Sequence, residues 1–244
     1  MKQLLGLVVT LVFVAASISS RENFQSSQEV RELRPIAAVD IKNSINGETP
    51  AGTKIKEGTW TVDAEAEILE AAAEPLVQSW LEFGPEIREK IATIKGVGKA
   101  EGRERIQSRF GVGLYGSNGF QIRLVPAWNR VEVVRRGDVV DSIGFELKAE
   151  LRYEMEFACI EEEESWLLKV RVWEFDSERP EMPLMKLWYP KAKLRFPLAG
   201  RGVLTATPFS GKPVTFYSAE IYLEEFNPVN AAGETVDSKI DSVE

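Results

Sequence analysis

Apolar residues occupy every second position from Leu147 to Cys159, and the residues between them are charged as far as Glu156. A period of two over this length predicts a β-strand with one buried face and one face exposed to water. Four consecutive glutamates, Glu161–Glu164, follow, and the alternation then resumes from Trp166 to Val172. The two runs therefore predict a long antiparallel hairpin with the glutamates at its turn.

The register of this hairpin is predicted from the same pattern. Pairing Ile160 with Ser165 places apolar residues opposite one another on one face. On the other face it places Glu156 opposite Lys169 and Glu154 opposite Arg171. Opposite charges that meet across two strands stabilise a pairing, so both faces favour this one register.

The rest of the chain reads as short strands between turn residues, which is typical of a β-sandwich. Residues 64–74 also have the propensity of a helix, and no strand is predicted in the proline-rich stretch Pro180–Pro197. We predict an all-β fold, an antiparallel two-sheet jelly-roll sandwich. The strands are expected at residues 60–68, 76–83, 87–97, 106–114, 120–125, 131–135, 139–143, 204–206 and 214–223.

The ends of the chain differ from this central part. Residues 1–20 have a basic start, an apolar run and small residues from Ser17 to Ser20, the pattern of a cleaved signal peptide. The apolar run is too short for a membrane span, so we expect a secreted or periplasmic protein with no membrane span in its mature form. Residues 21–55 are expected to form a linker with a possible first strand at 33–40, residues 56–226 the sandwich, and residues 227–244 a disordered acidic tail.

Composition excludes several classes of chemistry. The 244 residues contain no histidine and one cysteine, and the net charge is −8. Without histidine there is no Ser-His-Asp or Cys-His nucleophile and no histidine-ligated metal, and with one cysteine no internal disulfide forms. The negative balance argues against nucleic acid or acidic lipid as a partner. Cys159 is predicted to be a buried, inert thiol.

Three segments together resemble a known superfamily. They are the strand–glycine turn–strand of residues 109–123, the W-x-L-x-V run of residues 166–173, and residues 205–214, which lead to Phe216. Over residues 55–225 this layout resembles the concanavalin A-like lectin/glucanase jelly rolls, and more narrowly secreted bacterial modules near the laminin-G-like and 3-keto-disaccharide hydrolase domains. The resemblance implies two twisted sheets, one of them concave, and carbohydrate binding or glycoside chemistry. The hydrolase domain usually carries a His-Gly-like dipeptide near its closing strands, where this chain has Phe209-Ser210-Gly211.

Glu174, Asp176 and Glu178 have the E-x-D-x-E spacing of laminarinase-like glucanases, which share the jelly roll. On one strand the three carboxylates would line one face, with one as nucleophile and one as acid/base. Arg179-Pro180 breaks the strand directly afterwards, so a solvated strand end is the preferred interpretation. Catalysis by these residues is the weaker alternative.

Aromatic and arginine side chains are the other candidate site. Exposed rings on a concave sheet bind sugars, because the C–H face of a sugar stacks on them. The candidates are Trp173 on the wet face of the hairpin, Trp128 in a turn, and Tyr115 beside a glycine turn, with coverage by a loop or by Arg152 as the alternative for Trp173. Arg109, beside Gln107 and Arg105, and Arg123 across the next hairpin are candidates to bond sugar hydroxyls or uronate carboxylates. Pairing with Glu101, Glu104 or Glu132 is the alternative for these arginines.

No metal site or cofactor is predicted. Ca²⁺ is possible but unsupported: the run Glu161–Glu164 suggests it, but four consecutive glutamates in a turn cannot all converge on one ion, and a solvated loop is preferred. Three hypotheses follow: a secreted non-catalytic module that binds a polysaccharide or oligosaccharide, a carboxylate-dependent glycoside hydrolase, and a structural envelope or matrix protein. The first is preferred.

Overall fold

The structure, a computed structural model, describes residues 34–74, 76–88, 90–103, 106–148, 150–209 and 211–223. The predicted signal peptide and acidic tail lie outside these residues. The described part contains strands and three short 3₁₀ turns, η1 (Gly116–Asn118), η2 (Pro126–Trp128) and η3 (Lys191–Lys193). The strands are β1 (Ala37–Ala38), β2 (Thr53–Glu57), β3 (Trp60–Asp63), β4 (Ile68–Ala71), β5 (Ser79–Ile87), β6 (Ile91–Ala100), β7 (Gly102–Arg103), β8 (Ile106–Gln107), β9 (Arg109–Leu114), β10 (Phe120–Val125), β11 (Arg130–Arg135), β12 (Asp138–Gly144), β13 (Arg152–Glu161), β14 (Ser165–Glu174), β15 (Met185–Pro190), β16 (Gly200–Thr207) and β17 (Val214–Leu223).

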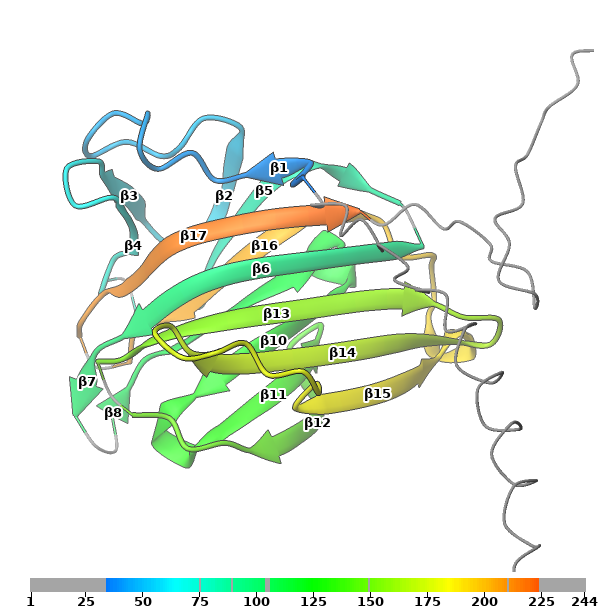
Figure 1. The fold of residues 1–244 in the computed structure, drawn as a ribbon. Helices are drawn as coiled ribbons and strands as arrows, with labels where there is room; N and C mark the ends of the chain where they lie inside the picture. The colour runs from blue at the N-terminus through cyan, green and yellow to red at the C-terminus, as the bar shows by residue number, and fades with distance from the viewer. Residues whose placement is uncertain are drawn as a thin grey trace, which may run out of the picture. The chain divides into compact units, whose positions relative to one another are not determined.

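These strands form an antiparallel two-sheet sandwich, as predicted. The eight-stranded sheet has the order β15-β14-β13-β6-β17-β4-β3, with β1 paired to β17, and the seven-stranded sheet has the order β12-β11-β10-β9-β16-β5-β2. In Figure 1 the eight-stranded sheet lies in front, and β10, β11, β12 and β16 of the seven-stranded sheet lie behind it. Consecutive strands β9 to β12 and the hairpin β13–β14 are neighbours, whereas β6 and β17 pair across a long sequence separation.

The core lies between the two sheets because each sheet has one apolar face. Phe157 and Phe216 of the eight-stranded sheet and Phe110, Val112 and Leu204 of the seven-stranded sheet are fully buried in one cluster. Each alternates with residues on the outer face of its sheet, as a period of two requires. Burial of these apolar side chains is the main favourable term in the folding free energy.

The predicted hairpin exists as β13 and β14, but its predicted register is wrong by two residues. Glu156 lies opposite Arg171 and not Lys169, and Glu154 lies opposite Trp173 and not Arg171. The strands continue to pair beyond Ile160, and Glu162 N–H donates to the Ser165 carbonyl over 2.9 Å, which leaves a two-residue turn. A shift of two keeps every side chain on its predicted face.

Lys191, which begins η3 directly after β15, contacts two of the four glutamates at the end of the hairpin. Lys191 lies 2.7 Å from a Glu161 carboxylate oxygen, and it also donates to the Glu163 carbonyl. Both contacts place a cation beside the acidic run. The alternation pattern predicts a four-residue turn because it contains no information about this contact with a residue about thirty positions away.

Other strands agree with the pattern to different degrees. β10 and β17 have the predicted bounds, whereas residues 60–71 form the hairpin β3–β4, not one strand or a helix. Its turn contains Glu67 at a φ of 51°, and Asp63 accepts a hydrogen bond from Ala66 N–H. β15 lies inside the proline-rich stretch for which no strand was predicted, and it pairs with β14.

The segment before residue 56 contributes strands to both sheets. β1 pairs with β17 and β2 pairs with β5. Within the described residues, no helix has the length and apolar character that crossing a membrane requires. Cys159 is a free thiol with no solvent exposure, as predicted, and burial raises its pKa well above the ordinary value.

Candidate functional site

The outer face of the seven-stranded sheet carries three of the predicted site residues. Strand pairing places one row of residues across this face, and the row runs through Trp80, Thr205, Gly111, Arg123 and Glu132. The residues directly before or after them in the sequence point into the core, so the side chains of this row point to the outer face of the sheet. Arg109 begins the central strand β9 beside this row.

Two of the three residues of β9 that face outward, Gly111 and Gly113, are glycines. A Cβ atom at Gly111 would lie 1.8 Å from the carbonyl oxygen of Ile122, and one at Gly113 would lie 2.8 Å from that of Phe120. A side chain at either position would collide with the backbone of β10. The strand therefore adds only Arg109 to the outer face.

Glu132 organises the arginines of this face. Its side chain is fully buried, and it accepts hydrogen bonds from Arg123 Nε over 2.8 Å and from the adjacent terminal nitrogen over 2.6 Å. Arg130 forms a second ion pair with the same carboxylate. A buried carboxylate needs such partners, because an unpaired charge in the interior is strongly unfavourable.

Arg109 lies between two exposed aromatic rings. Its guanidinium carbon is 4.7 Å from the ring centroid of Trp128 and 4.8 Å from that of Phe209. Arg130 contacts the same Trp128 ring over 4.3 Å. Trp128 is 55% exposed and Phe209 is 45% exposed, so a ligand has access to both rings. We name Arg109, Arg123, Arg130, Glu132, Trp128 and Phe209 the arginine–aromatic cluster.

Local backbone chemistry fixes Trp128. Pro126 begins the turn η2, and Asn129 ends it at a φ of 47°, a conformation that asparagine tolerates better than most residues. The Asn129 side-chain oxygen accepts a hydrogen bond from Leu147 N–H over 3.1 Å, and the Asn129 backbone carbonyl accepts one from Phe145 N–H over 2.9 Å. The turn that carries Trp128 is thus tied to the segment leading to β13.

The electrostatics of the cluster are dominated by positive charge. Burial, and after it the Arg123 guanidinium group, lower the pKa of Arg109; Arg130 acts in the same direction and Glu132 opposes them. Arg123 pairs with Glu132, which is the alternative that the sequence analysis left open for it. Arg105 lies outside the described residues, and Gln107 lies on β8, which contacts η2.

The other two predicted ligand-binding aromatics lie elsewhere. The Tyr115 ring is fully buried in the core, 5.5 Å from the Trp166 ring centroid, so it presents no exposed face. Its backbone, at a φ of 65°, borders a polar pocket of about 230 Å³ at the other end of the seven-stranded sheet, beside Lys54 and Arg201. The prediction of an exposed Tyr115 ring is wrong, because the residue after β9 turns its side chain inward.

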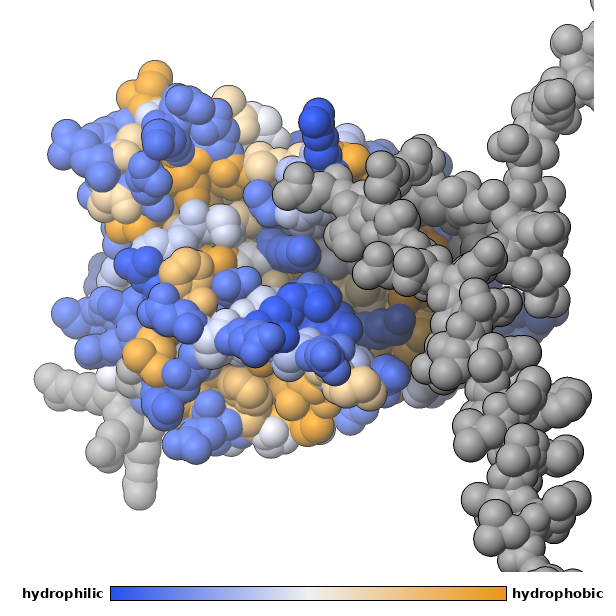
Figure 2. All heavy atoms as spheres, in the orientation of Figure 1, coloured by the Kyte–Doolittle hydropathy of each residue, from blue (hydrophilic) through white to orange (hydrophobic). Residues whose placement is uncertain are grey.

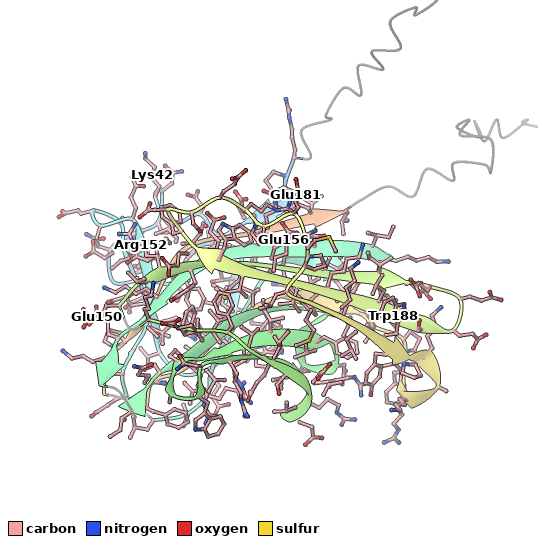
Figure 3. The ribbon with its side chains drawn as sticks, turned by 60° about the horizontal axis from the view of Figure 1, so that its bottom comes forward. Lys42, Glu150, Arg152, Glu156, Glu181 and Trp188 are labelled. Carbon is pink, nitrogen blue, oxygen red and sulfur yellow. The ribbon has the colours of Figure 1, made fainter. Side chains whose placement is uncertain are left out.

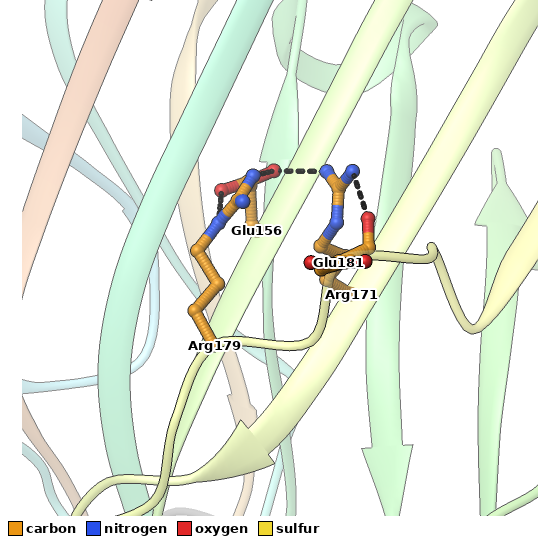
Figure 4. Close-up of polar contacts among 4 residues, drawn as sticks. All are labelled: Glu156, Arg171, Arg179 and Glu181. Atoms are coloured by element: carbon orange, nitrogen blue, oxygen red, sulfur yellow. Dashed lines mark hydrogen bonds and ion pairs between the residues drawn. The ribbon is translucent and has the colours of Figure 1, made fainter. Parts of the chain in front are cut away.

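Trp173 lies on the outer face of the eight-stranded sheet, as predicted, but it is only 7% exposed. The segment between β14 and β15 crosses this face (Figure 1). Arg179 of that segment donates two hydrogen bonds to Glu156, at 2.7 and 2.9 Å, and Arg171 bonds both Glu156 and the Glu181 carbonyl (Figure 4). We name residues 175–184 the strap.

Hydrophilic side chains cover much of the middle of this outer face (Figure 2). Strand pairing places Arg171, Glu156, Lys95 and Glu220 in one row across four strands, and cations and anions alternate along it. Trp188, with 54% of its surface exposed, lies on the same sheet at the opposite end from Glu150 and Arg152 (Figure 3). The exposed Trp188 is therefore separate from the arginine–aromatic cluster, which belongs to the other sheet.

The three carboxylates Glu174, Asp176 and Glu178 do not share one strand face. β14 ends at Glu174, and Ser177 N–H donates to the Glu174 carbonyl over 2.9 Å, so Asp176 lies in a turn. Glu174 and Asp176 line a pocket of about 310 Å³ together with Arg152 and Phe175, and Glu178 is not among its lining residues. Lys148 also holds Glu174 at 2.9 Å. The strand geometry on which the glucanase-like interpretation depends is absent from this part of the structure.

No site for a metal is formed by the described residues, since no group of three or more cysteine, aspartate or glutamate side chains converges there. Glu161 is instead paired with Lys191.

Comparisons with known proteins agree with the fold. No family model matches the sequence, and no curated protein sequence matches it. Among solved structures, the carbohydrate binding module CBM66 from Bacillus subtilis matches 70% of this chain and 96% of its own, with a TM-score of 0.51 and 10% identity. The metal-free carbohydrate recognition domain of Emp46p matches 78% of this chain and 98% of its own, with a TM-score of 0.54 and 11% identity.

A bifunctional GH43-CE protein from Bacteroides eggerthii is also similar. It matches 79% of this chain, which spans 28% of that protein, with a TM-score of 0.54 and 14% identity. At these identities the likeness is one of fold. The chain has the jelly-roll architecture of lectin-like β-sandwiches.

Sequence reasoning missed Phe209 and Arg130 as members of the cluster. Arg130 is two positions after Trp128, and Phe209 lies two positions after the end of β16. Neither spacing identifies a site, because Phe209 reaches Arg109 only through the pairing of β16 with β9.

Proposed function

We propose that this chain is a secreted, non-catalytic module that binds a glycan or cell-surface polymer on the outer face of its seven-stranded sheet. One observation carries the proposal: two half-exposed aromatic rings, Trp128 and Phe209, flank the same arginine. Isolated exposed aromatics are common on proteins, but a pair held around a charged group is an arrangement suited to a ligand.

The chemistry of the arginine–aromatic cluster suits a sugar. The C–H face of a pyranose packs on an indole ring, and guanidinium N–H groups donate hydrogen bonds to its oxygens. Gly111 and Gly113 contribute no side chains to the outer face, so a sugar ring beside Trp128 would meet no side chain from these two positions of β9.

The described neighbours support sugars as the ligand class. CBM66 is named as a carbohydrate binding module, and the matching Emp46p domain is named as a carbohydrate recognition domain. Their identity to this chain is low, so the support is for the class of ligand and not for a particular sugar.

A glycoside hydrolase remains the second candidate function. Its support is the pocket of about 310 Å³ that contains Glu174 and Asp176. Two carboxylates at a suitable separation are the minimum for glycoside hydrolysis. Because Glu174 already pairs with Lys148 and Glu178 lies outside the pocket lining, binding without cleavage is preferred.

A titration separates these two functions. Purified protein is titrated against a panel of soluble polysaccharides while tryptophan fluorescence and new reducing ends are measured in the same samples. A saturable fluorescence change without new reducing ends is expected. Reducing ends that appear with the wild type and disappear in Glu174→Gln would establish the hydrolase instead, and the absence of any response would favour a structural role.

A further inference from the structure

Arg109 is the one arginine of the cluster that has no anionic partner among the described residues. Glu132 is occupied by Arg123 and Arg130. The Arg109 guanidinium group lies against two ring faces, and within the described residues no carbonyl or carboxylate accepts a hydrogen bond from it. A guanidinium group has five N–H donors, and aromatic faces leave most of them unsatisfied.

The charge around Arg109 is unbalanced. The charged groups that act on it are Arg123, Arg130 and Glu132, which together with Arg109 make three cations against one anion. This local excess occurs in a chain whose net charge is −8. Surface cations in such a chain are usually neutralised by nearby carboxylates, as Lys148 is by Glu174.

Burial makes the excess more significant. Arg109 is partly withdrawn from water, and both this desolvation and the two neighbouring arginines lower its pKa. Each of these effects disfavours the charged guanidinium group, and an anion placed against it would relieve them. The cost of leaving Arg109 without a counter-ion is therefore regained when an anionic ligand binds.

We propose that the sugar bound at this site is acidic: its ring packs on Trp128 and its anionic group takes the free N–H donors of Arg109. The inference rests on the proposed function and specifies its ligand class. A carboxylate can accept two parallel hydrogen bonds from the planar guanidinium group. A sulfate ester would also place anionic oxygens on the sugar ring. Phe209 lies on the other side of Arg109 and limits where this anionic group can sit.

Matched ligands test the inference. Affinities are measured by calorimetry for oligogalacturonate, for the same oligomer fully methyl-esterified, for a sulfated carrageenan oligomer without carboxylates, and for neutral oligosaccharides. At low ionic strength an acidic oligomer is expected to bind about tenfold or more tightly than its neutral counterpart, because hydrogen bonds to charged groups are the stronger ones. The difference should decrease with added salt.

Variants assign the difference to Arg109. Arg109→Gln should weaken binding of the acidic oligomer by about tenfold more than binding of the methyl ester, so that the preference is lost, and Arg109→Lys should retain part of the preference. Arg195→Gln removes an equal charge from an exposed position two residues after η3, outside the cluster, and should preserve the preference. Thermal melting of each variant shows that the fold is intact.

The outcomes distinguish the inference from the function on which it rests. Arg109-dependent binding of oligogalacturonate identifies the anion as a carboxylate, and Arg109-dependent binding of carrageenan alone identifies it as a sulfate. If acidic and neutral oligomers bind alike, or Arg109→Gln weakens both equally, the inference is overturned while glycan binding stands. If no oligomer binds, both are overturned.

Discussion

Glu132 holds the guanidinium groups of Arg123 and Arg130 on the outer face of the seven-stranded sheet, and it has no solvent exposure. We predict that Glu132→Gln lowers the free energy of unfolding by about 2 kcal/mol, because two arginines lose their carboxylate. The loss stays below the ~3–5 kcal/mol of a fully buried pair, since both arginines reach water at their edges. Chemical denaturation measures the effect, with the exposed Glu178→Gln as the control. A change as small as that of the control would contradict the role of Glu132.

Cys159 provides a second test on a single side chain. Its thiol is fully buried and its pKa is raised by burial, and the thiolate is the reactive form. We expect a thiol-specific reagent to leave the native protein unmodified at neutral pH and to modify it completely in denaturant. Rapid modification of the native protein would show that the β13–β14 hairpin does not bury its apolar face.

Three members of the arginine–aromatic cluster could be predicted individually, but the cluster as a group could not. Arg109, Arg123 and Trp128 were candidates because of their residue types and the strands that carry them. Their convergence with Phe209 depends on the pairing of β16 with β9, which joins segments about a hundred residues apart. Periodicity gives the face on which a side chain lies, but it does not give the neighbours of a strand in the sheet.

Glu156 bonds the strap to the eight-stranded sheet through Arg179. Burial by itself would raise the pKa of Glu156, but hydrogen bonds and charge from Arg179 and Arg171 outweigh this and hold the pKa below its usual value. A carboxyl group with a depressed folded-state pKa stabilises the native contacts above its unfolded pKa of about 4.3. That contribution is lost as the pH falls through the lower, folded-state value.

We therefore predict that the strap loosens in acid before the sheets unfold. Hydrogen exchange of residues 175–184, corrected for the intrinsic rate, should increase below about pH 4 and stay slow at neutral pH. In Glu156→Gln exchange should already be fast at neutral pH and should change little with acid. Equal protection in wild type and variant at neutral pH would show that other contacts hold the strap.

Strands were predictable where the pattern is local. β10, β17 and the hairpin β13–β14 follow from alternation and turn residues. The two-residue error in the hairpin register arose because Lys191, from a segment not predicted to be a strand, lies against Glu161 and Glu163. β15 was missed because prolines surround it, although its alternate residues Leu187 and Tyr189 pack on the core.

The molecule as a whole is a lectin-like sandwich with two different outer faces. On the eight-stranded sheet, cations and anions alternate, the strap crosses the outer face, and Trp173 is buried. On the seven-stranded sheet, cations exceed anions around two accessible rings. The fold class followed from the sequence, whereas this asymmetry did not, because it depends on which charged residues find partners after folding.

The central claim is that a glycan binds at Trp128, and two nearly equally exposed tryptophans on opposite sheets allow a direct test. The measurement is calorimetric affinity of wild type, Trp128→Ala and Trp188→Ala for the polysaccharide that gives a saturable response. We predict that Trp128→Ala weakens binding about tenfold or more, since the variant loses both a ring contact of up to about 1.5 kcal/mol and the apolar area that the ring buries, and that Trp188→Ala binds like the wild type. Unchanged affinity in Trp128→Ala, or a loss confined to Trp188→Ala, would contradict the account.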